Sequence, residues 1–256
     1  MTELVFILDR SGSMSGMEKD TIGGFNSMIA KQRGEPGEAL VSTVLFDNDI
    51  EVIHDRVPLE KVSLLTEEEY FVRGCTALLD AVGGAIHHIG NVHKYARPED
   101  RPEKTLFVIT TDGLENASRR YNYERVKKMI EHEQEKYGWE FLFLGADIDV
   151  AAEAGRMGIR PDRTASYRKT NDGVKCLFSL VDDVVDATRS GKSFDDELSA
   201  YAAEETKKTG KRKKEKKGLE QSLVILSEAR MSLMRAIRQK TFLCFPKNHS
   251  LQTIRS

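Results

Sequence analysis

Short apolar runs alternate with longer amphipathic segments along most of this chain. Three runs are almost continuously apolar, and they are Leu4–Leu8, Leu106–Thr110 and Phe141–Leu144. Runs of this length without polar alternation are typical of parallel strands that are covered on both faces. An aspartate follows each run within three residues. The pattern therefore predicts buried parallel strands with acidic residues near their carboxyl ends.

The segments between these runs repeat apolar residues three and four positions apart, as one face of an α-helix requires. The expected helices are Met17–Gln32, Ala77–Ile89, Tyr123–Lys136 and Val174–Val185. Ala39–Asp55 differs, because its two apolar runs flank an Asp-Asn-Asp turn and leave no room for a helix. That segment predicts a β-hairpin and one antiparallel edge strand. The whole pattern predicts an α/β fold with a doubly wound, mostly parallel, Rossmann-like sheet.

Polar oxygen atoms follow the first buried run. Asp9 is succeeded at alternate positions by Ser11 and Ser13. Alternate residues of an extended loop point the same way, and doubly wound sheets bind ligands beyond the carboxyl ends of their strands. Mg²⁺ prefers about six oxygen ligands, so these side chains are candidate metal ligands. The alternative is a plain polar turn that ends a buried strand.

Three motifs, FILDRSGSM, GCTALLDA and FVITTDG, occur in this order along the chain. Together they resemble a von Willebrand factor A (vWA) domain of the intracellular prokaryotic type, with its metal-ion-dependent adhesion site (MIDAS). The resemblance implies that the hydroxyls of Ser11, Ser13 and Thr76 approach a Mg²⁺ ion. It implies that the carboxylates of Asp9 and Asp112 act on the ion directly or through water. Mn²⁺ or Ca²⁺ could replace Mg²⁺ in an oxygen-only site.

Residues beside these motifs are expected to support or border the site. Asp80 lies one helical turn after Thr76, so it could orient that hydroxyl or its loop, or simply favour the first turns of its helix. The expected partner-binding rim comprises Arg10, Cys75, Gly113 and Asp147. For Asp147 and Asp149, capping of the following helix is the favoured interpretation over a place on the rim.

The candidate ligands also indicate a function. Three of the five groups are neutral hydroxyls, so they compensate the charge of a divalent ion poorly. A Glu or Asp side chain of a partner protein is the natural further ligand. The sequence therefore predicts a non-enzymatic adaptor that captures an acidic side chain of another protein.

A Mg²⁺-dependent phosphoester hydrolase is the alternative from another functional class. Haloacid-dehalogenase-like phosphatases place a second aspartate two residues after their aspartate nucleophile. Ser11 stands at that position here, and no lysine or histidine partner is identifiable. The group that would act as acid and base is therefore missing.

Charge divides the chain into an acidic body and a basic end. Residues 1–203 carry 25 Lys and Arg against 36 Asp and Glu, whereas residues 204–256 carry 14 against 5. The expected organisation is a vWA domain at 1–190, a basic linker at 191–218, an amphipathic helix at 219–238 and a poorly ordered tail at 239–256. Lys207–Lys217 favours a solvated linker, and attraction to nucleic acid is the alternative.

The sequence does not predict a metal or redox site built from cysteines or histidines. The chain has three cysteines, Cys75, Cys176 and Cys244. They are widely spaced and form no C-x-x-C pair. Neither a disulfide framework nor a thiolate zinc site is therefore expected. His87 and His88 would point about 100° apart on a helix, so with His93 they do not predict a zinc site.

No apolar run approaches the roughly 18–20 residues that span a bilayer. The first buried run begins by Leu4, which leaves no room for a signal peptide. We therefore expect a cytoplasmic protein without a membrane partner. The identity of the protein partner and the oligomeric state do not follow from the sequence.

Overall fold

A six-stranded sheet forms the centre of the protein, with strand order β3-β2-β1-β4-β5-β6. The computed structural model describes residues 1–207, and the first compact unit is Met1–Ala202. The strands are β1 (Thr2–Asp9), β2 (Ala39–Phe46), β3 (Ile50–Pro58), β4 (Lys104–Thr111), β5 (Glu140–Gly145) and β6 (Thr164–Ser166). Every neighbouring pair is parallel except β2 and β3. The predicted doubly wound sheet with one antiparallel edge strand is thereby confirmed.

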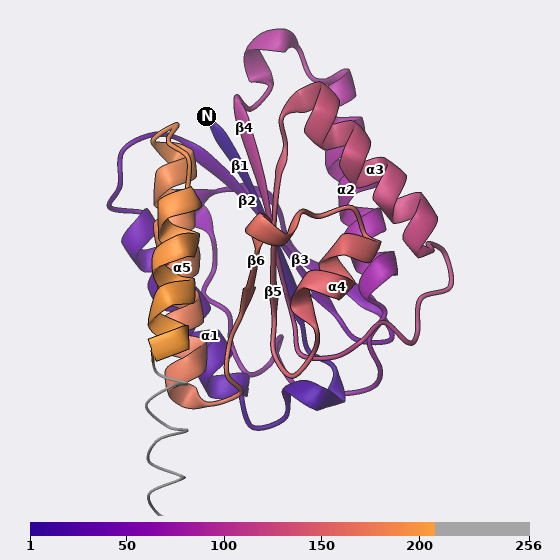
Figure 1. Ribbon diagram of the computed structural model, residues 1–256. Coiled ribbons are helices and arrows are strands. Elements are labelled where there is room, and N and C mark those ends of the chain that lie inside the picture. The colour runs from indigo at the N-terminus through magenta and orange to yellow at the C-terminus, as the bar shows by residue number, and fades with distance from the viewer. Residues whose placement is uncertain (208–256) are drawn as a thin grey trace, which may run out of the picture. The chain divides into compact units, whose positions relative to one another are not determined.

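From Thr2 to Arg189, five α-helices and four short 3-10 helices accompany the strands. The α-helices are α1 (Glu18–Gln32), α2 (Leu78–Tyr95), α3 (Tyr123–Tyr137), α4 (Val150–Arg156) and α5 (Asn171–Arg189). The 3-10 helices are Gly12–Met14, Leu59–Lys61, Pro98–Asp100 and Pro161–Arg163. Figure 1 shows α1 and α5 on one side of the sheet and α2, α3 and α4 on the other.

The apolar run of β1 is continuous because the strand has a hydrophobic layer on both faces. Leu4, Phe6 and Leu8 pack in the core cluster that includes α1 and α5. Val5 and Ile7 pack in the second cluster, which includes α2 and α3. Successive side chains of a strand point to opposite faces, so a central strand between two helical layers has no solvent-facing position.

The first compact unit continues past residue 190, where the sequence places the domain boundary. Residues 195–202 are helical, and Phe194 and Leu198 are buried in the core cluster that contains α5. The expected helix at 219–238, the tail at 239–256 and the basic segment beyond Lys207 lie outside the described residues. Within residues 1–207, each helix is too short or too polar to cross a bilayer.

Two adjacent glycines of α2 provide a matched test of the packing on one side of the sheet. A Cβ on Gly83 would lie 2.4 Å from the ring of Tyr121, whereas a Cβ on Gly84 would meet no atom within 4 Å. Overpacking of this kind costs about 1–3 kcal/mol, whereas Ala in an open helix position stabilises by about 0.5–1 kcal/mol. We therefore expect Gly83→Ala to lower, and Gly84→Ala to maintain or raise, the free energy of unfolding in urea. Equal stability of the two variants would contradict the close packing of α2 against Tyr121.

Candidate metal centre

Asp9 ends β1 and anchors the loop that follows it. Its side chain is completely buried. Its Oδ1 accepts a hydrogen bond of 2.7 Å from the backbone N–H of Ser11, and its Oδ2 accepts one of 2.6 Å from the hydroxyl of Thr111. Burial raises the pKa of the Asp9 carboxyl, although the hydrogen bonds from Ser11 and Thr111 act in the opposite direction. Asp9 thus fixes the first loop against the end of β4.

Three hydroxyl groups from two loops meet beside this carboxylate. The Oγ atoms of Ser11 and Ser13 lie 3.0 Å apart. The Thr76 hydroxyl donates a hydrogen bond of 3.1 Å to Ser11 Oγ. The Ser13 hydroxyl in turn donates to Oδ1 of Asp112, which follows β4. The residues that the sequence singles out on three loops therefore form one connected cluster.

The loop before α2 is held in place through its main chain. The Thr76 N–H donates to the Asn116 side-chain oxygen at 2.9 Å, and the Thr76 carbonyl accepts from the Asn116 N–H at 3.0 Å. The Gly12 N–H donates to the Gly74 carbonyl at 3.2 Å. These bonds join the second loop to both other loops, so the position of the Thr76 hydroxyl is fixed by backbone contacts.

Gly113 allows the third loop to approach the hydroxyls closely. A Cβ at this position would lie 3.0 Å from Thr76 Oγ1 and 3.2 Å from Ser13 Oγ. The residue is partly exposed. Its lack of a side chain therefore keeps the space beside two candidate ligands open.

Asp80 orders the loop that follows Asp112. Its carboxylate accepts backbone N–H bonds from three consecutive residues at 2.8–2.9 Å, and they are Arg119, Arg120 and Tyr121. The Asp80 N–H donates to Ser118 Oγ at 2.9 Å. Asp80 thus supports the third loop rather than the hydroxyl one turn before it.

Arg10 does not belong to the surface rim, which corrects the interpretation from the sequence. Its side chain is completely buried, and Nε lies 2.9 Å from an Asp47 carboxylate oxygen. Its Nη1 lies 2.7 Å from Glu51 and donates to the Glu69 carbonyl at 2.9 Å. These three partners compensate the charge of the Arg10 guanidinium, so the side chain can be buried.

The other expected rim residues do lie at the surface. Cys75 and Asp147 are exposed, and Asp147 has a positive φ of 54°. Asp149 caps α4, since its side chain accepts a hydrogen bond of 3.1 Å from the Ala152 N–H. The predicted capping role is thus confirmed for Asp149, while Asp147 lies in the turn before it.

Lys169 is a member of the cluster that the sequence does not reveal. Its Nζ lies 2.8 Å from Asp112 Oδ2, and it donates a hydrogen bond to the Ser13 carbonyl oxygen. Lys169 lies between β6 and α5, and no motif surrounds it. Only the strand order, which places β6 two positions from β4, brings this loop within reach of the site.

Two buried tyrosines complete the surroundings of the carboxylates. The Tyr70 hydroxyl donates to the Asp9 carbonyl at 2.5 Å. Burial raises the pKa of Tyr70 well above its ordinary value, and burial together with the charges of Asp112 and Asp9 raises that of Tyr167. Both phenols therefore stay neutral and add no negative charge to the cluster.

The donor set fits a hard divalent cation. Two carboxylates and three hydroxyls supply oxygen atoms alone, the ligand type that Mg²⁺ prefers. Among residues 1–207, no group of three His, Cys, Asp or Glu side chains is placed to hold a metal. A cation at this site would therefore depend on the hydroxyls of Ser11, Ser13 and Thr76.

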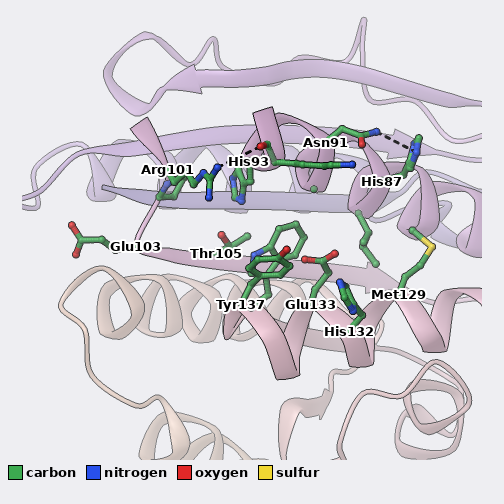
Figure 2. A pocket seen from close by; sticks show the side chains of 15 residues that line it. His87, Asn91, His93, Arg101, Glu103, Thr105, Met129, His132, Glu133 and Tyr137 are labelled. Carbon is green, nitrogen blue, oxygen red and sulfur yellow. Dashed lines mark hydrogen bonds between the residues drawn. The ribbon is translucent and has the colours of Figure 1, made fainter. Parts of the chain in front are cut away.

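A separate pocket of about 550 Å³ lies between α2, α3 and the start of β4. Figure 2 shows His87, His93 and His132 among its lining side chains. His87 Nε2 lies 3.2 Å from the Asn91 side-chain nitrogen, and His93 Nε2 lies 3.3 Å from a Glu3 carboxylate oxygen. His88 turns away to Asp55 at 2.8 Å. The pocket includes Thr105 near the amino end of β4, whereas the metal centre lies beyond the carboxyl end.

The sequence matches no protein-family model and no curated protein. Solved structures, by contrast, share the fold. The vWF domain of the type V pili tip protein Mfa5 from Porphyromonas gingivalis has a TM-score of 0.53 and 10% identity, over 73% of this chain and 96% of that chain. The PilB minor pilin of Streptococcus sanguinis, a D319A mutant, has a TM-score of 0.50 and 14% identity.

The PilB match covers 72% of this chain and 61% of that chain. Proximal thread matrix protein 1 from the mussel byssus, described with a zinc-occupied MIDAS motif, has a TM-score of 0.49 and 14% identity, over 72% of this chain and 45% of that chain. This chain therefore spans less than two thirds of both proteins. Likeness at these identities establishes the fold alone. Sheet order, helical layers and structural neighbours together show that the chain has a von Willebrand factor A-like fold.

Proposed function

We propose that this protein is a metal-dependent protein-binding module whose metal centre captures an acidic side chain of a partner. The observation that carries the proposal is the connected cluster of Ser13, Ser11 and Thr76 hydroxyls that ends on Asp112. Mg²⁺ suits this donor set, and Mn²⁺ or Ca²⁺ could replace it. The cytoplasmic location stays a prediction from the sequence.

Each candidate ligand would have its own role in holding the cation. Ser11, Ser13 and Thr76 would hold the cation through oxygen atoms that carry no formal charge. Asp112 would supply charge from the third loop, and Asp9 would supply it while holding the first loop in place. A bound divalent ion supplies an electrophilic position that an external carboxylate can occupy. Three of the five candidate ligands are neutral hydroxyls, so much of the charge of the ion is left to attract the partner's carboxylate.

The contacts of Asp9 support binding over hydrolysis. A haloacid-dehalogenase-like phosphatase needs a free aspartate oxygen as nucleophile. Asp9 is completely buried, and both of its carboxylate oxygens accept hydrogen bonds from the chain. Ser11 occupies the position of the acid–base residue and is itself tied to Ser13 and Thr76. The arrangement therefore favours an adaptor.

Selection from a displayed peptide library tests this proposal. With Mg²⁺ present, the wild-type protein should select peptides that contain Asp or Glu and that a chelator releases. Synthetic versions of these peptides should lose at least about tenfold in affinity when the acidic residue becomes Asn or Gln, since a charged ligand is lost. Ser13→Ala and Thr76→Ala should lose the same binding while the circular dichroism and melting curve persist.

Ser15→Ala is the matched control for this experiment. Ser15 lies in the same loop and is exposed, and its backbone N–H donates to the Gly12 carbonyl at 3.3 Å, outside the hydroxyl cluster. This variant should bind the selected peptides as the wild type does. Peptide binding that persists with chelator, or in Ser13→Ala and Thr76→Ala, would overturn the proposed function.

A further inference from the structure

We infer that Lys169 is a resident cation of the metal centre, which competes with the divalent ion for Asp112 and so sets the metal affinity of the site. This inference rests on the proposed metal-dependent function. It assigns to Lys169 a specificity-determining role, although the residue lies outside all three motifs of the site.

The charge of Lys169 lies directly on a candidate metal ligand. One oxygen of Asp112 accepts the Ser13 hydroxyl, and the other lies 2.8 Å from Lys169 Nζ. The Asp112 side chain is 1% exposed and that of Lys169 is 29% exposed. A pair that is largely shielded from water is weakly screened by salt, so the ammonium acts strongly on this carboxylate.

The second contact of Lys169 places its charge on the ligand loops as well. Nζ donates a hydrogen bond to the carbonyl oxygen of Ser13, whose hydroxyl belongs to the candidate ligand cluster. One ammonium group therefore bridges the first loop and the third loop. A divalent cation held by Ser13 and Asp112 would have to share both residues with it.

The main chain around Lys169 is anchored on both sides. The Tyr167 N–H donates to the Gly145 carbonyl at 2.9 Å, next to the end of β5. Thr170 caps α5 by accepting a hydrogen bond of 3.1 Å from the Gly173 N–H. A Cβ on Gly173 would lie 2.0 Å from the Arg168 carbonyl oxygen, so the turn packs tightly on the helix. The turn that carries Lys169 is therefore held by main-chain contacts on both sides, which positions the ammonium group at the site.

Two routes to metal binding are available, and Lys169 weakens both. If the ammonium stays in place, it repels the divalent ion at short range. If the ammonium leaves, the ion pair with Asp112 and the bond to Ser13 are lost. In either case the chain binds metal less tightly than its oxygen donors alone would allow. The site therefore loads only at higher cation concentrations.

Titration of the full-length protein with Mn²⁺, followed by the electron paramagnetic resonance signal of the free ion, tests this role. Lys169→Met should bind Mn²⁺ about tenfold or more tightly than the wild type, because one short-range positive charge is removed. Lys169→Gln should behave in the same way. Lys169→Arg, which keeps the charge, should stay within about threefold of the wild type.

Lys175→Met is the control for a general change of net charge. Lys175 lies on the exposed face of α5 a few residues further on, and its loss should leave Mn²⁺ affinity unchanged. Wild-type binding with equal or weaker binding by Lys169→Met and Lys169→Gln would overturn this inference and leave the metal site intact. If neither the wild type nor these variants bound Mn²⁺, the proposed function would fall together with the inference.

Discussion

Replacing Arg10 with alanine is expected to lower the free energy of unfolding by roughly 3–5 kcal/mol, as measured by urea denaturation. Arg10 is completely buried and contacts Asp47, whose side chain is 1% exposed. Its removal also ends contacts with Glu51 and the Glu69 carbonyl. The loss is large because breaking a buried pair leaves charged and polar groups without compensation.

Arg73→Ala is the matched control for this prediction. Arg73 Nε lies 2.8 Å from the same Asp47 oxygen, but the Arg73 side chain is 46% exposed. Exposed pairs of this kind contribute about 0–1 kcal/mol, so this variant should stay close to the wild type. If Arg10→Ala were no more destabilising than Arg73→Ala, the structural role assigned to Arg10 would be wrong.

Replacing Asp112 with alanine is expected to weaken Mn²⁺ binding by about 100-fold or more in a calorimetric titration. The variant loses a carboxylate that would hold the ion, and it leaves the ammonium of Lys169 beside hydroxyls that carry no charge. Repulsion would then act without the attraction that offsets it. Of the variants considered for the site, this one should lower metal affinity the most.

Asp147→Ala provides the comparison for the loss of one negative charge. Asp147 lies in the turn after β5 and is exposed, so water screens its charge. We expect its Mn²⁺ affinity to stay within about threefold of the wild type. Equal effects of Asp112→Ala and Asp147→Ala would show that only the general field of the protein attracts the ion. The assignment of Asp112 as a ligand would then fail.

The central strands could be predicted because their apolar runs are local and continuous. β1 and β4 are buried on both faces, and so their sequences carry the signal without help from distant residues. β6 has only three residues, Thr164–Ser166, which is too short to show any periodicity. Lys169 could not be assigned for the same reason, since its contact with Asp112 follows from where β6 joins the sheet.

Arg10 and Asp80 show where local spacing fails. Arg10 lies between Asp9 and Ser11 in the motif, and this position alone predicts a place on the surface rim. Its partner Asp47 is 37 positions away, on a turn whose placement depends on the pairing of β2 with β1. Asp80 lies one turn after Thr76, but its carboxylate binds backbone N–H groups about 40 positions away. In both cases a long-range contact determines the role of a charged side chain.

Anomalous diffraction from crystals grown with Mn²⁺ would show whether the hydroxyl cluster holds a divalent ion. We expect one strong peak within about 2.5 Å of the hydroxyl oxygens of Ser11 and Ser13, the distance of an oxygen-bound divalent ion. A well-ordered crystal in which Mn²⁺ bound elsewhere, while the Ser11, Ser13 and Thr76 hydroxyls bonded only to one another, would contradict it.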